Sequence, residues 1–443
     1  MVCGFATDAM AAGFYLPGRG IRPLGRAGAY VAGSEGNLNA LWYNPANLAK
    51  MDHLQLTVDL GLIPLDFDYT RAPRTMPNGD IRTYDTVSNM APPKVDPQVL
   101  IGGPLPWKGL VWAFGIYAPY LSGHTFPEDG AQRYVLIDND RSLLGFFHLA
   151  VAWNIGDHFQ LGAGFQNVPA DFVLVNMATG YTGLFGDPED PNLDILTRIE
   201  LKDFFAPTGN AGVTVGLSDW LSAALSFQGP VVFSDKDAKL TSRLPSHPES
   251  HDAKINGDSV AGNIKFPPVA RAALRLKRPS FDVEVDGVWE GWSILKEIKA
   301  NPNDVSVSGL PGLDTVPVGP LTVPMEWQDT YSVRVGGDVD FSDSFTGRLG
   351  YAYETNAIPD RRYTVFIADA KKHMMAVGAS FHHGGFTLDG SFAYYLMPDR
   401  TITNSQWRQI DPTDNEGKVT LIVGNGTYHQ RYMAFGLGAT FEL

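Results

Sequence analysis

Long and short connections alternate strictly along this chain. Fourteen segments carry the period-2 alternation of apolar and polar residues that is typical of β-strands with two unlike faces. We expect these strands at about 54–71, 97–106, 110–122, 142–156, 158–175, 208–218, 220–234, 267–278, 280–292, 329–341, 344–356, 371–383, 385–397 and 429–443. Seven long connections lie at 72–96, 123–141, 176–207, 235–266, 293–328, 357–370 and 398–428, and six tight turns separate them, at 107–109, 157, 219, 279, 342–343 and 384.

This arrangement distinguishes between two all-β folds. A soluble sandwich also has alternating strands, but it has no reason to keep all its long loops at one end. Bacterial outer-membrane barrels have an even number of antiparallel strands, short periplasmic turns and long outer loops. The sequence therefore predicts a 14-stranded antiparallel transmembrane β-barrel with both chain ends in the periplasm. Its last strand, ending in Phe441-Glu442-Leu443, is expected to pair with the first and remove the open edge.

Charged residues within the strands indicate which face lines the lumen. Arg271 and Arg275 share one face of a strand, and Asp282, Glu284 and Asp286 share one face of the next. Each such charge would cost about 2–4 kcal/mol in hydrocarbon, so we expect all five to point inward. Opposite charges on neighbouring strands can then pair across the ladder. Aromatic residues near strand ends are expected to form interfacial girdles, namely Trp42, Trp112, Tyr117, Trp153, Trp220, Trp289, Tyr351 and Tyr353.

Composition excludes several other classes of protein. The net charge of −14 argues against nucleic acid as a partner, because phosphate binding needs a basic face. The single cysteine, Cys3, excludes an intrachain disulfide. The longest apolar run, at 110–121, is too short for a transmembrane helix, which needs about 20 residues. A helical membrane protein is thereby excluded, whereas a barrel is not.

The sequence contains none of the common catalytic or metal-binding motifs. G-x-S-x-G, H-E-x-x-H and C-x-x-C are absent. The pair His382-His383 falls in an expected periplasmic turn, and the acidic clusters in the long loops are interpreted as solvated. We therefore expect no enzymatic activity, no catalytic residue, no metal and no cofactor.

The amino-terminal region differs from the rest of the chain. Residues 9–11 read Ala-Met-Ala, the small-residue pattern of a signal cleavage site, although a basic segment and a full apolar core are missing. We interpret residues 1–11 as the remnant of an export signal, with a simple disordered terminus as the alternative. Residues 12–52 are rich in Gly, Ala and Asn, lack strand alternation and are too apolar for disorder. We predict that residues 12–52 form a hatch inside the barrel and that residues 53–443 form its wall.

Motifs within this region resemble those of a known family. The sequence Asn44-Pro45-Ala46 follows a Gly-Arg-Ala element at 25–27, and weaker motifs lie at 264–268 (IKFPP), 327–331 (WQDTY) and 358–362 (IPDRR). Together they resemble the long-chain fatty-acid and aromatic-hydrocarbon transporters of the FadL/TodX (OMPP1) family of outer-membrane proteins. The resemblance spans nearly the whole chain, and the Asn-Pro-Ala motif is its most specific part.

The resemblance implies a function and a set of candidate residues. It implies passive transport of hydrophobic compounds, captured in a barrel pocket and released through a lateral opening near the hatch, with Asn44, Pro45 and Ala46 beside that opening. The expected partners are a hydrophobic ligand such as a fatty acid, outer-membrane lipid and lipopolysaccharide, and the protein is expected to be a monomer in the bacterial outer membrane. A lipid-processing barrel enzyme, or a receptor or porin-like barrel, remains the alternative. Four inward arginines are candidates for binding a ligand head group or, instead, for salt bridges that fill the lumen: Arg271, Arg275, Arg334 and Arg348.

Overall fold

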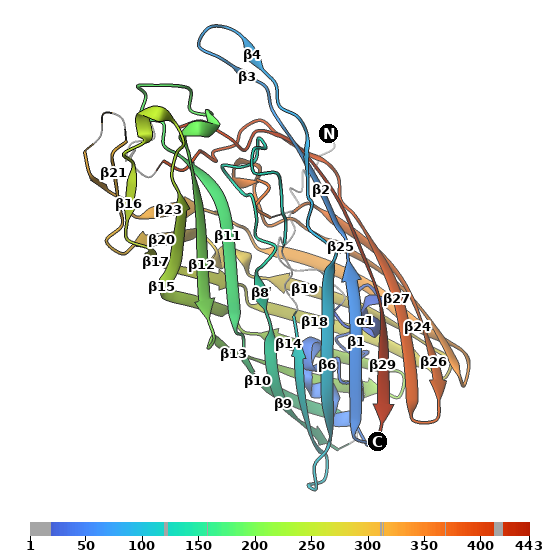
Figure 1. Cartoon of the computed structure of the whole chain (residues 1–443). Coiled ribbons are helices and arrows are strands. Elements are labelled where there is room, and N and C mark those ends of the chain that lie inside the picture. The colour runs from blue at the N-terminus through green and yellow to red at the C-terminus, as the bar shows by residue number, and fades with distance from the viewer. Residues whose placement is uncertain are drawn as a thin grey trace, which may run out of the picture.

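A computed structural model describes residues 19–118, 123–156, 158–310, 312, 314–367, 369–411 and 420–443. Within these residues, fourteen antiparallel strands form a closed barrel (Figure 1). The barrel closes where β29 pairs with β1, from Gln55 opposite Glu442 to Leu62 opposite Phe435. In their order around the barrel, the strands are β1 (Gln55–Ile63), β6 (Lys94–Pro104), β7 (Leu110–Tyr117), β9 (Phe146–Ile155), β10 (Phe159–Asn167), β13 (Pro207–Ser218), β14 (Leu221–Gln228), β18 (Val269–Arg278), β19 (Phe281–Glu290), β24 (Thr330–Ser342), β25 (Phe345–Glu354), β26 (Lys372–His383), β27 (Phe386–Leu396) and β29 (Gly426–Glu442).

A second sheet continues one side of the wall beyond the barrel, at the end with the long loops (Figure 1). Prolines mark several of the breaks between the two sheets, at Pro169, Pro230 and Pro267-Pro268. Because proline has no N–H to donate, it interrupts the ladder and lets the wall bend. This upper sheet consists of β8 (Leu143–Leu144), β11 (Ala170–Thr179), β12 (Asp194–Asp203), β15 (Val231–Arg243), β17 (Ser259–Phe266), β20 (Glu297–Pro302) and β23 (Leu321–Pro324).

The barrel and the upper sheet carry their apolar side chains on opposite faces. In β18 of the barrel, Arg271 and Arg275 are buried in the lumen, while Leu274 on the outer face is 56% exposed. In β17 of the upper sheet, Phe266 is buried on the inner face and Lys265 is exposed on the outer face. The apolar outer face of the barrel suits lipid, and the polar outer face of the upper sheet suits water. The breaks between the sheets therefore mark the outer boundary of the membrane.

Shorter elements complete the fold. The wall is extended by β2 (Leu65–Arg71), β5 (Val87–Ser88) and β28 (Arg400–Ile402). A hairpin of β3 (Arg74–Thr75) and β4 (Ile81–Arg82) projects from the outer end, as does a small sheet of β16 (Lys254–Asn256), β21 (Ser306–Ser308) and β22 (Val316–Pro317) (Figure 1). The helices are α1 (Ile21–Leu24), α2 (Ala40–Tyr43), η1 (Pro45–Lys50), η2 (Pro191–Leu193), η3 (Pro248–Ser250), η4 (Trp292–Ile294) and η5 (Asp360–Arg362). In the described part of the chain, none of them is long and apolar enough to cross a bilayer.

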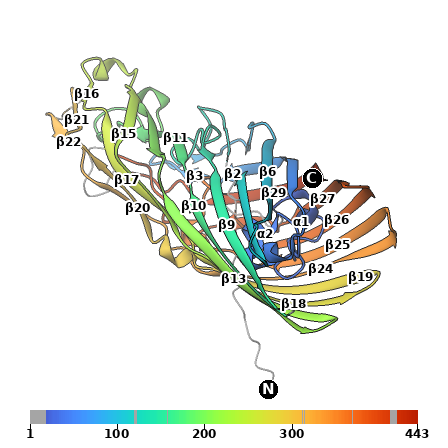
Figure 2. The same ribbon diagram turned by 90° about the horizontal axis from the view of Figure 1, so that it is seen from below.

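The described part of the predicted hatch lies inside the ring of strands. Seen from below, α1 and α2 are enclosed by the barrel (Figure 2). Helix α1 contacts β1, β26, β27 and β29, whereas η1 contacts β7, β9, β10 and β13 on the opposite side. The hatch therefore fills the lumen from wall to wall. Residues 1–11 and the first seven residues of the predicted hatch lie outside the described residues.

The predicted fold is confirmed, with two corrections. The predicted loops at 176–207, 235–266 and 293–328 contain strands of the upper sheet. Their apolar side chains need to be buried even above the membrane, and the strands achieve this by forming a sheet with these side chains on its inner face. Two aromatic residues expected in the lipid girdles, Trp42 and Tyr117, are instead buried inside the barrel. Trp42 belongs to the hatch, and Tyr117 is the last residue of β7 on its inward face.

Candidate functional site

A buried arginine ties the hatch to the barrel wall. Nη1 of Arg26 lies 2.7 Å from Oδ1 of Asp282 and 2.9 Å from Oδ1 of Asp338, and Nη2 lies 3.3 Å from Oε2 of Glu284. Only 1% of the Arg26 side chain is exposed. Its Nε donates to the carbonyl of Ala29 at 2.9 Å, which fixes the guanidinium plane. Charge therefore holds this end of the hatch against β19 and β24.

The acidic run on β19 also binds the hatch backbone. The amide of Ala32 donates to Glu284 at 2.6 Å, and the amide of Tyr30 donates to Asp286 at 3.0 Å. Both carboxylates point into the lumen, as the sequence predicts for this strand. Backbone N–H groups without partners inside a lumen are costly, so these bonds stabilise the hatch in one position.

The Asn44-Pro45-Ala46 motif lies against the opposite wall. Nδ2 of Asn44 donates to Oγ1 of Thr214 on β13 at 2.9 Å and to the carbonyl of Val31 at 3.2 Å, while Oδ1 accepts the amide of Ala46 at 3.2 Å. Gly162 on β10 faces the peptide between Pro45 and Ala46, and a Cβ at this position would overlap it. The motif thus closes a turn of the hatch and also attaches that turn to β10 and β13.

The four candidate head-group arginines are all buried, but three of them have carboxylate partners. Arg275 pairs with Asp282 and Glu35. Arg348 pairs with Asp338 and Asp389, and Arg334 lies 3.8 Å from a carboxylate oxygen of Glu354.

Arg271 differs from the other three. Within the described residues it has no carboxylate within ion-pair distance, and its Nε and Nη2 have no hydrogen-bond partner. Its guanidinium carbon instead lies 4.8 Å from the centre of the Trp42 ring, which is a cation–π contact. Arg271 is therefore a buried cation next to the hatch that is able to accept an anion.

A large apolar cavity lies above the hatch, on the concave face of the upper sheet. Its volume is about 960 Å³, which is at the upper end of the range for small-molecule sites. The inward side chains of consecutive strands line it, such as Ile199 and Leu201 of β12 and Ile264 and Phe266 of β17. Apolar surface of this extent suits the binding of a hydrophobic compound.

In the part of the chain that the structure describes, the cavity reaches a gap in the strand pairing between β6 and β9. Residues 94–98 of β6 pair with β1 on one side, but the ladder between β6 and β7 begins only at Val99 opposite Ile116. Strand β7 ends at Tyr117, and among the described residues, which do not include 119–122, the next wall element on that side is β8. The cavity lining includes both sides of this gap: Lys94, Val95 and Pro97 on β6, Ala118 after β7, and Leu143 and Leu144 on β8.

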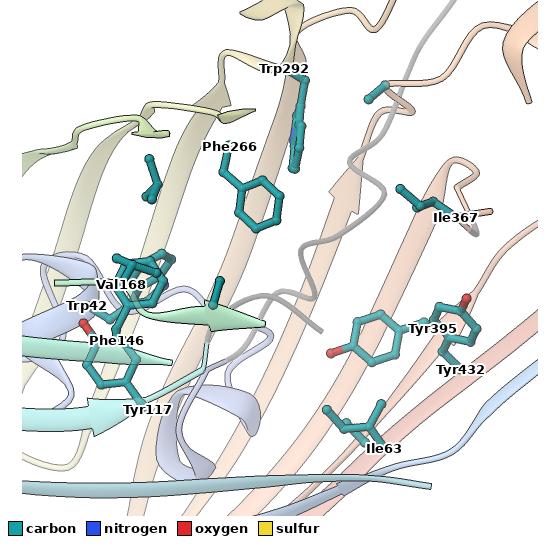
Figure 3. Packing of buried hydrophobic residues seen from close by; sticks show 14 of the residues in the cluster. Trp42, Ile63, Tyr117, Phe146, Val168, Phe266, Trp292, Ile367, Tyr395 and Tyr432 are labelled. Atoms are coloured by element: carbon teal, nitrogen blue, oxygen red, sulfur yellow. The ribbon is translucent and has the colours of Figure 1, made fainter. Parts of the chain in front are cut away.

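The hatch touches the base of this gap through Trp42. The ring of Trp42 packs edge-on against Tyr117 and Phe146, with centroids 6.1 and 5.8 Å apart (Figure 3). A chain of hydrogen bonds runs from the Tyr117 hydroxyl to Nδ1 of His148 at 2.6 Å, from Nε2 of His148 to Asn210 at 3.0 Å, and from Asn210 to the carbonyl of Leu41 at 2.7 Å. Trp42 and its neighbour Leu41, two and three residues before Asn44, therefore adjoin the gap from the side of β7 and β9, while Arg19 and Asn39 of the hatch bind Asp96 and Gln98 on β6.

A closed 14-stranded barrel with a lipid-facing apolar wall and an internal hatch defines a class, the plugged transport barrels of the bacterial outer membrane. The model of one family within this class, described as outer membrane protein transport protein (OMPP1/FadL/TodX), matches residues 2–441. The chain therefore belongs to this family, and the predicted family, its outer-membrane location and its function class, uptake of hydrophobic compounds, are confirmed.

Solved structures share the fold at low sequence identity. A FadL homologue of Pseudomonas aeruginosa has a TM-score of 0.78 at 15% identity, over 97% of this chain and 100% of that one. The toluene transporter TodX of Pseudomonas putida has a TM-score of 0.64 at 14% identity, over 97% and 99% of the two chains. The toluene transporter TbuX of Ralstonia pickettii has a TM-score of 0.60 at 14% identity, with the same coverage. No curated protein sequence matches the chain.

Sequence reasoning missed most of the cavity. Its lining comes largely from segments that were predicted to be loops. A signal was present, because Thr197, Ile199 and Leu201 alternate with the charged residues Arg198, Glu200 and Lys202. The period matches a strand, although Pro and Gly residues, which are typical of loops, flank such segments.

Proposed function

We propose that this barrel passively transports hydrophobic compounds by binding them in the cavity of the upper sheet and releasing them sideways through the gap between β6 and β9. One observation carries the proposal: a single, mostly apolar cavity lining extends from the upper sheet to both edges of the gap. The outer surface beside the gap is also apolar, since Val95, Val99 and Phe147 are each more than 40% exposed. Cargo leaving at this point enters lipid and does not cross water.

Blocking the gap tests the route. In a Cys3→Ser background, Val95→Cys and Leu143→Cys place one thiol on each side of the gap, and a cleavable bis-maleimide joins them. We expect uptake of labelled hydrocarbon by cells to stop on cross-linking and to return when the linker is cleaved. The matched control is Val232→Cys with Lys265→Cys, a directly paired couple on the outer face of the upper sheet. Unchanged uptake after complete cross-linking of the gap would overturn the proposed route.

We also infer that Arg271 receives the head group of anionic amphiphiles such as fatty acids. Its burial, its unpaired N–H groups and its place next to Trp42 support this role. Arg271→Met should weaken binding of a long-chain fatty acid about tenfold or more, since a charged hydrogen bond contributes about 1.5–3 kcal/mol, while Arg275→Met should affect binding less. Mass spectrometry of lipids extracted from the purified protein would identify the natural cargo. Equal fatty-acid affinities of the wild type and Arg271→Met would contradict the assignment.

Asn44, Pro45 and Ala46 are proposed to hold the hatch in the position that supports the gap, acting through Leu41 and Trp42. The barrel is proposed to act as a monomer that contacts lipid and lipopolysaccharide with its outer face. Transport of this kind requires binding and no chemical step, so we propose that the protein is not an enzyme. Hydrolysis of outer-membrane lipids by the purified protein would contradict this.

A further inference from the structure

A row of polar side chains crosses the apolar inner face of the upper sheet. Strands β11, β12 and β15 lie side by side (Figure 1) and place Asn176 opposite Thr197, and Thr197 opposite Ser242. All three side chains line the cavity, and we call them the polar row. The next row toward the membrane is aliphatic and consists of Leu174, Ile199 and Leu240.

The polar row contains hydrogen-bonding groups that the protein does not use. Oγ1 of Thr197 donates to Oδ1 of Asn176 at 2.6 Å. This bond occupies the oxygen of the amide and leaves Nδ2 with its two N–H donors. In the described part of the chain, neither this Nδ2 nor the hydroxyl of Ser242 has a hydrogen-bond partner. Asn176 is only 4% exposed, and a buried amide without partners is costly, so an oxygen atom of a ligand would bind favourably here.

The end of the cavity nearest the membrane is aromatic. The rings of Phe172, Phe233 and Phe266 form a cluster with pairwise centroid distances of 5.1, 6.0 and 5.3 Å. Trp292 adjoins the cluster, 6.2 Å from the ring of Phe266 (Figure 3). Phe172 precedes Asn176 by four residues on β11, which is about 13 Å along the strand. A ligand that lies along β11 can therefore place its apolar end on the aromatic cluster and its polar end at the polar row.

The basic residues of the cavity lining are already paired. Lys94 binds Asp140, and Nζ of Lys299 lies 2.7 Å from Oε1 of Glu297. No other described residue of the lining is basic. An ionised carboxylate at the polar row would therefore lose its hydration without gaining an opposite charge, which is costly. A hydroxyl or carbonyl oxygen loses less and gains the N–H groups of Asn176.

We propose that the polar row binds the oxygen of a neutral cargo, an otherwise apolar alcohol, ketone or ester, while the aromatic cluster holds its hydrocarbon end. The inference rests on the proposed function and names the class of compound that the cavity takes. Asn176 donates to the ligand oxygen, Ser242 provides a second hydrogen bond, and Thr197 fixes the plane of the Asn176 amide. Unsubstituted hydrocarbons fit the same cavity, but they leave the polar row unpaired. An anionic head group instead finds its cation at Arg271, in the lumen.

Two ligands of equal chain length, dodecane and 1-dodecanol, test the proposal. Their dissociation constants are measured with radiolabelled ligand on the purified barrel in lipid nanodiscs, after subtraction of empty nanodiscs. Asn176→Leu replaces the amide with an apolar side chain of similar size. We expect it to weaken 1-dodecanol binding about fivefold, the scale of one hydrogen bond, and to leave dodecane binding unchanged or tighter. Ser242→Ala should act in the same direction.

Two further variants separate recognition of the oxygen from general effects. Thr241→Val is the matched control, because Thr241 adjoins Ser242 on β15 but is exposed on the outer face of the sheet, so both affinities should equal those of the wild type. Leu174→Ala, in the aliphatic row, should weaken binding of both ligands to the same extent. Equal effects of Asn176→Leu on the two ligands, or no effect on either, would overturn the assignment of the polar row. A wild type that binds neither ligand would instead contradict the proposed function itself.

Discussion

Arg26 offers the sharpest test of how the hatch is held. Arg26→Met keeps the length of the side chain and removes the charge that meets Asp282, Glu284 and Asp338. Removing one partner of a buried ion pair costs about 3–5 kcal/mol. The low end applies here, because the carboxylates keep other partners: Asp282 still binds Arg275, and Asp338 still binds neighbouring arginines.

A loss of about 3 kcal/mol shifts the balance between a docked and an undocked hatch by about 150-fold toward the undocked state. Each of the fourteen barrel strands pairs with both of its neighbours, so the wall should remain folded. The lumen then opens to water and exposes carboxylates that Arg26 had neutralised. We therefore expect Arg26→Met to conduct ions in planar bilayers with a preference for cations, whereas the wild type should be nearly silent.

Arg22→Met is the matched control. Arg22 also belongs to the hatch, but it is 28% exposed and lies 3.3 Å from a single carboxylate, that of Asp338. Partly exposed pairs contribute at most about 1 kcal/mol, so conductance should rise far less. If Arg26→Met remained silent and its hatch resisted proteolysis as well as that of the wild type, the electrostatic account of hatch docking would be refuted.

Three further changes test other contacts. Asn44→Ala removes the hydrogen bond to Thr214 and should destabilise the docked hatch by about 1–3 kcal/mol, measured by its rate of limited proteolysis. Gly162→Val places a side chain where the hatch backbone lies and should increase conductance, whereas Gly156→Val, in an open turn, should affect conductance much less. Burial raises the pKa of Asp369 in the outer loop to about 7. Between about pH 4 and pH 7 the folded loop therefore binds a proton that the open loop releases, so the stability of the loop should fall as the pH rises through this range. Hydrogen exchange, corrected for its intrinsic rate, should show this fall in the wild type but not in Asp369→Asn.

The wall could be predicted from the sequence because every strand that crosses the membrane must place apolar side chains on its lipid-facing side. Lipid tolerates only apolar side chains, so the outward residues of β18 and β19 within the membrane are apolar, and Arg271 and Glu284 are placed inward by the cost of any other position. The partners of these charges could not be predicted in the same way. Arg26 lies 256 residues before Asp282, and only the folded hatch brings them together.

The upper sheet was not predicted because its strands follow the opposite rule. Above the membrane the apolar side chains point inward, and prolines interrupt several of the strands where the rule changes. Phe266 and Val269 both point inward on either side of Pro267-Pro268, so the alternation shifts by one residue there. The period-2 alternation is therefore not continuous along residues 259–278. The cavity, formed by several such segments, was therefore not visible before the structure.

The reversal of polarity at the breaks also explains why the proposed exit is lateral. A molecule bound on the apolar inner face of the upper sheet has a polar, hatch-filled lumen below it. Burying roughly 150 Å² of apolar surface contributes about 4 kcal/mol, and the molecule would lose this among the polar groups of the lumen. Val95 and Leu143 instead continue the apolar surface from the cavity to the outer face of the barrel, where Val99 and Ile116 contact lipid. Along that path the cargo remains in apolar surroundings, so a gap in the wall is sufficient for transport without an energy source.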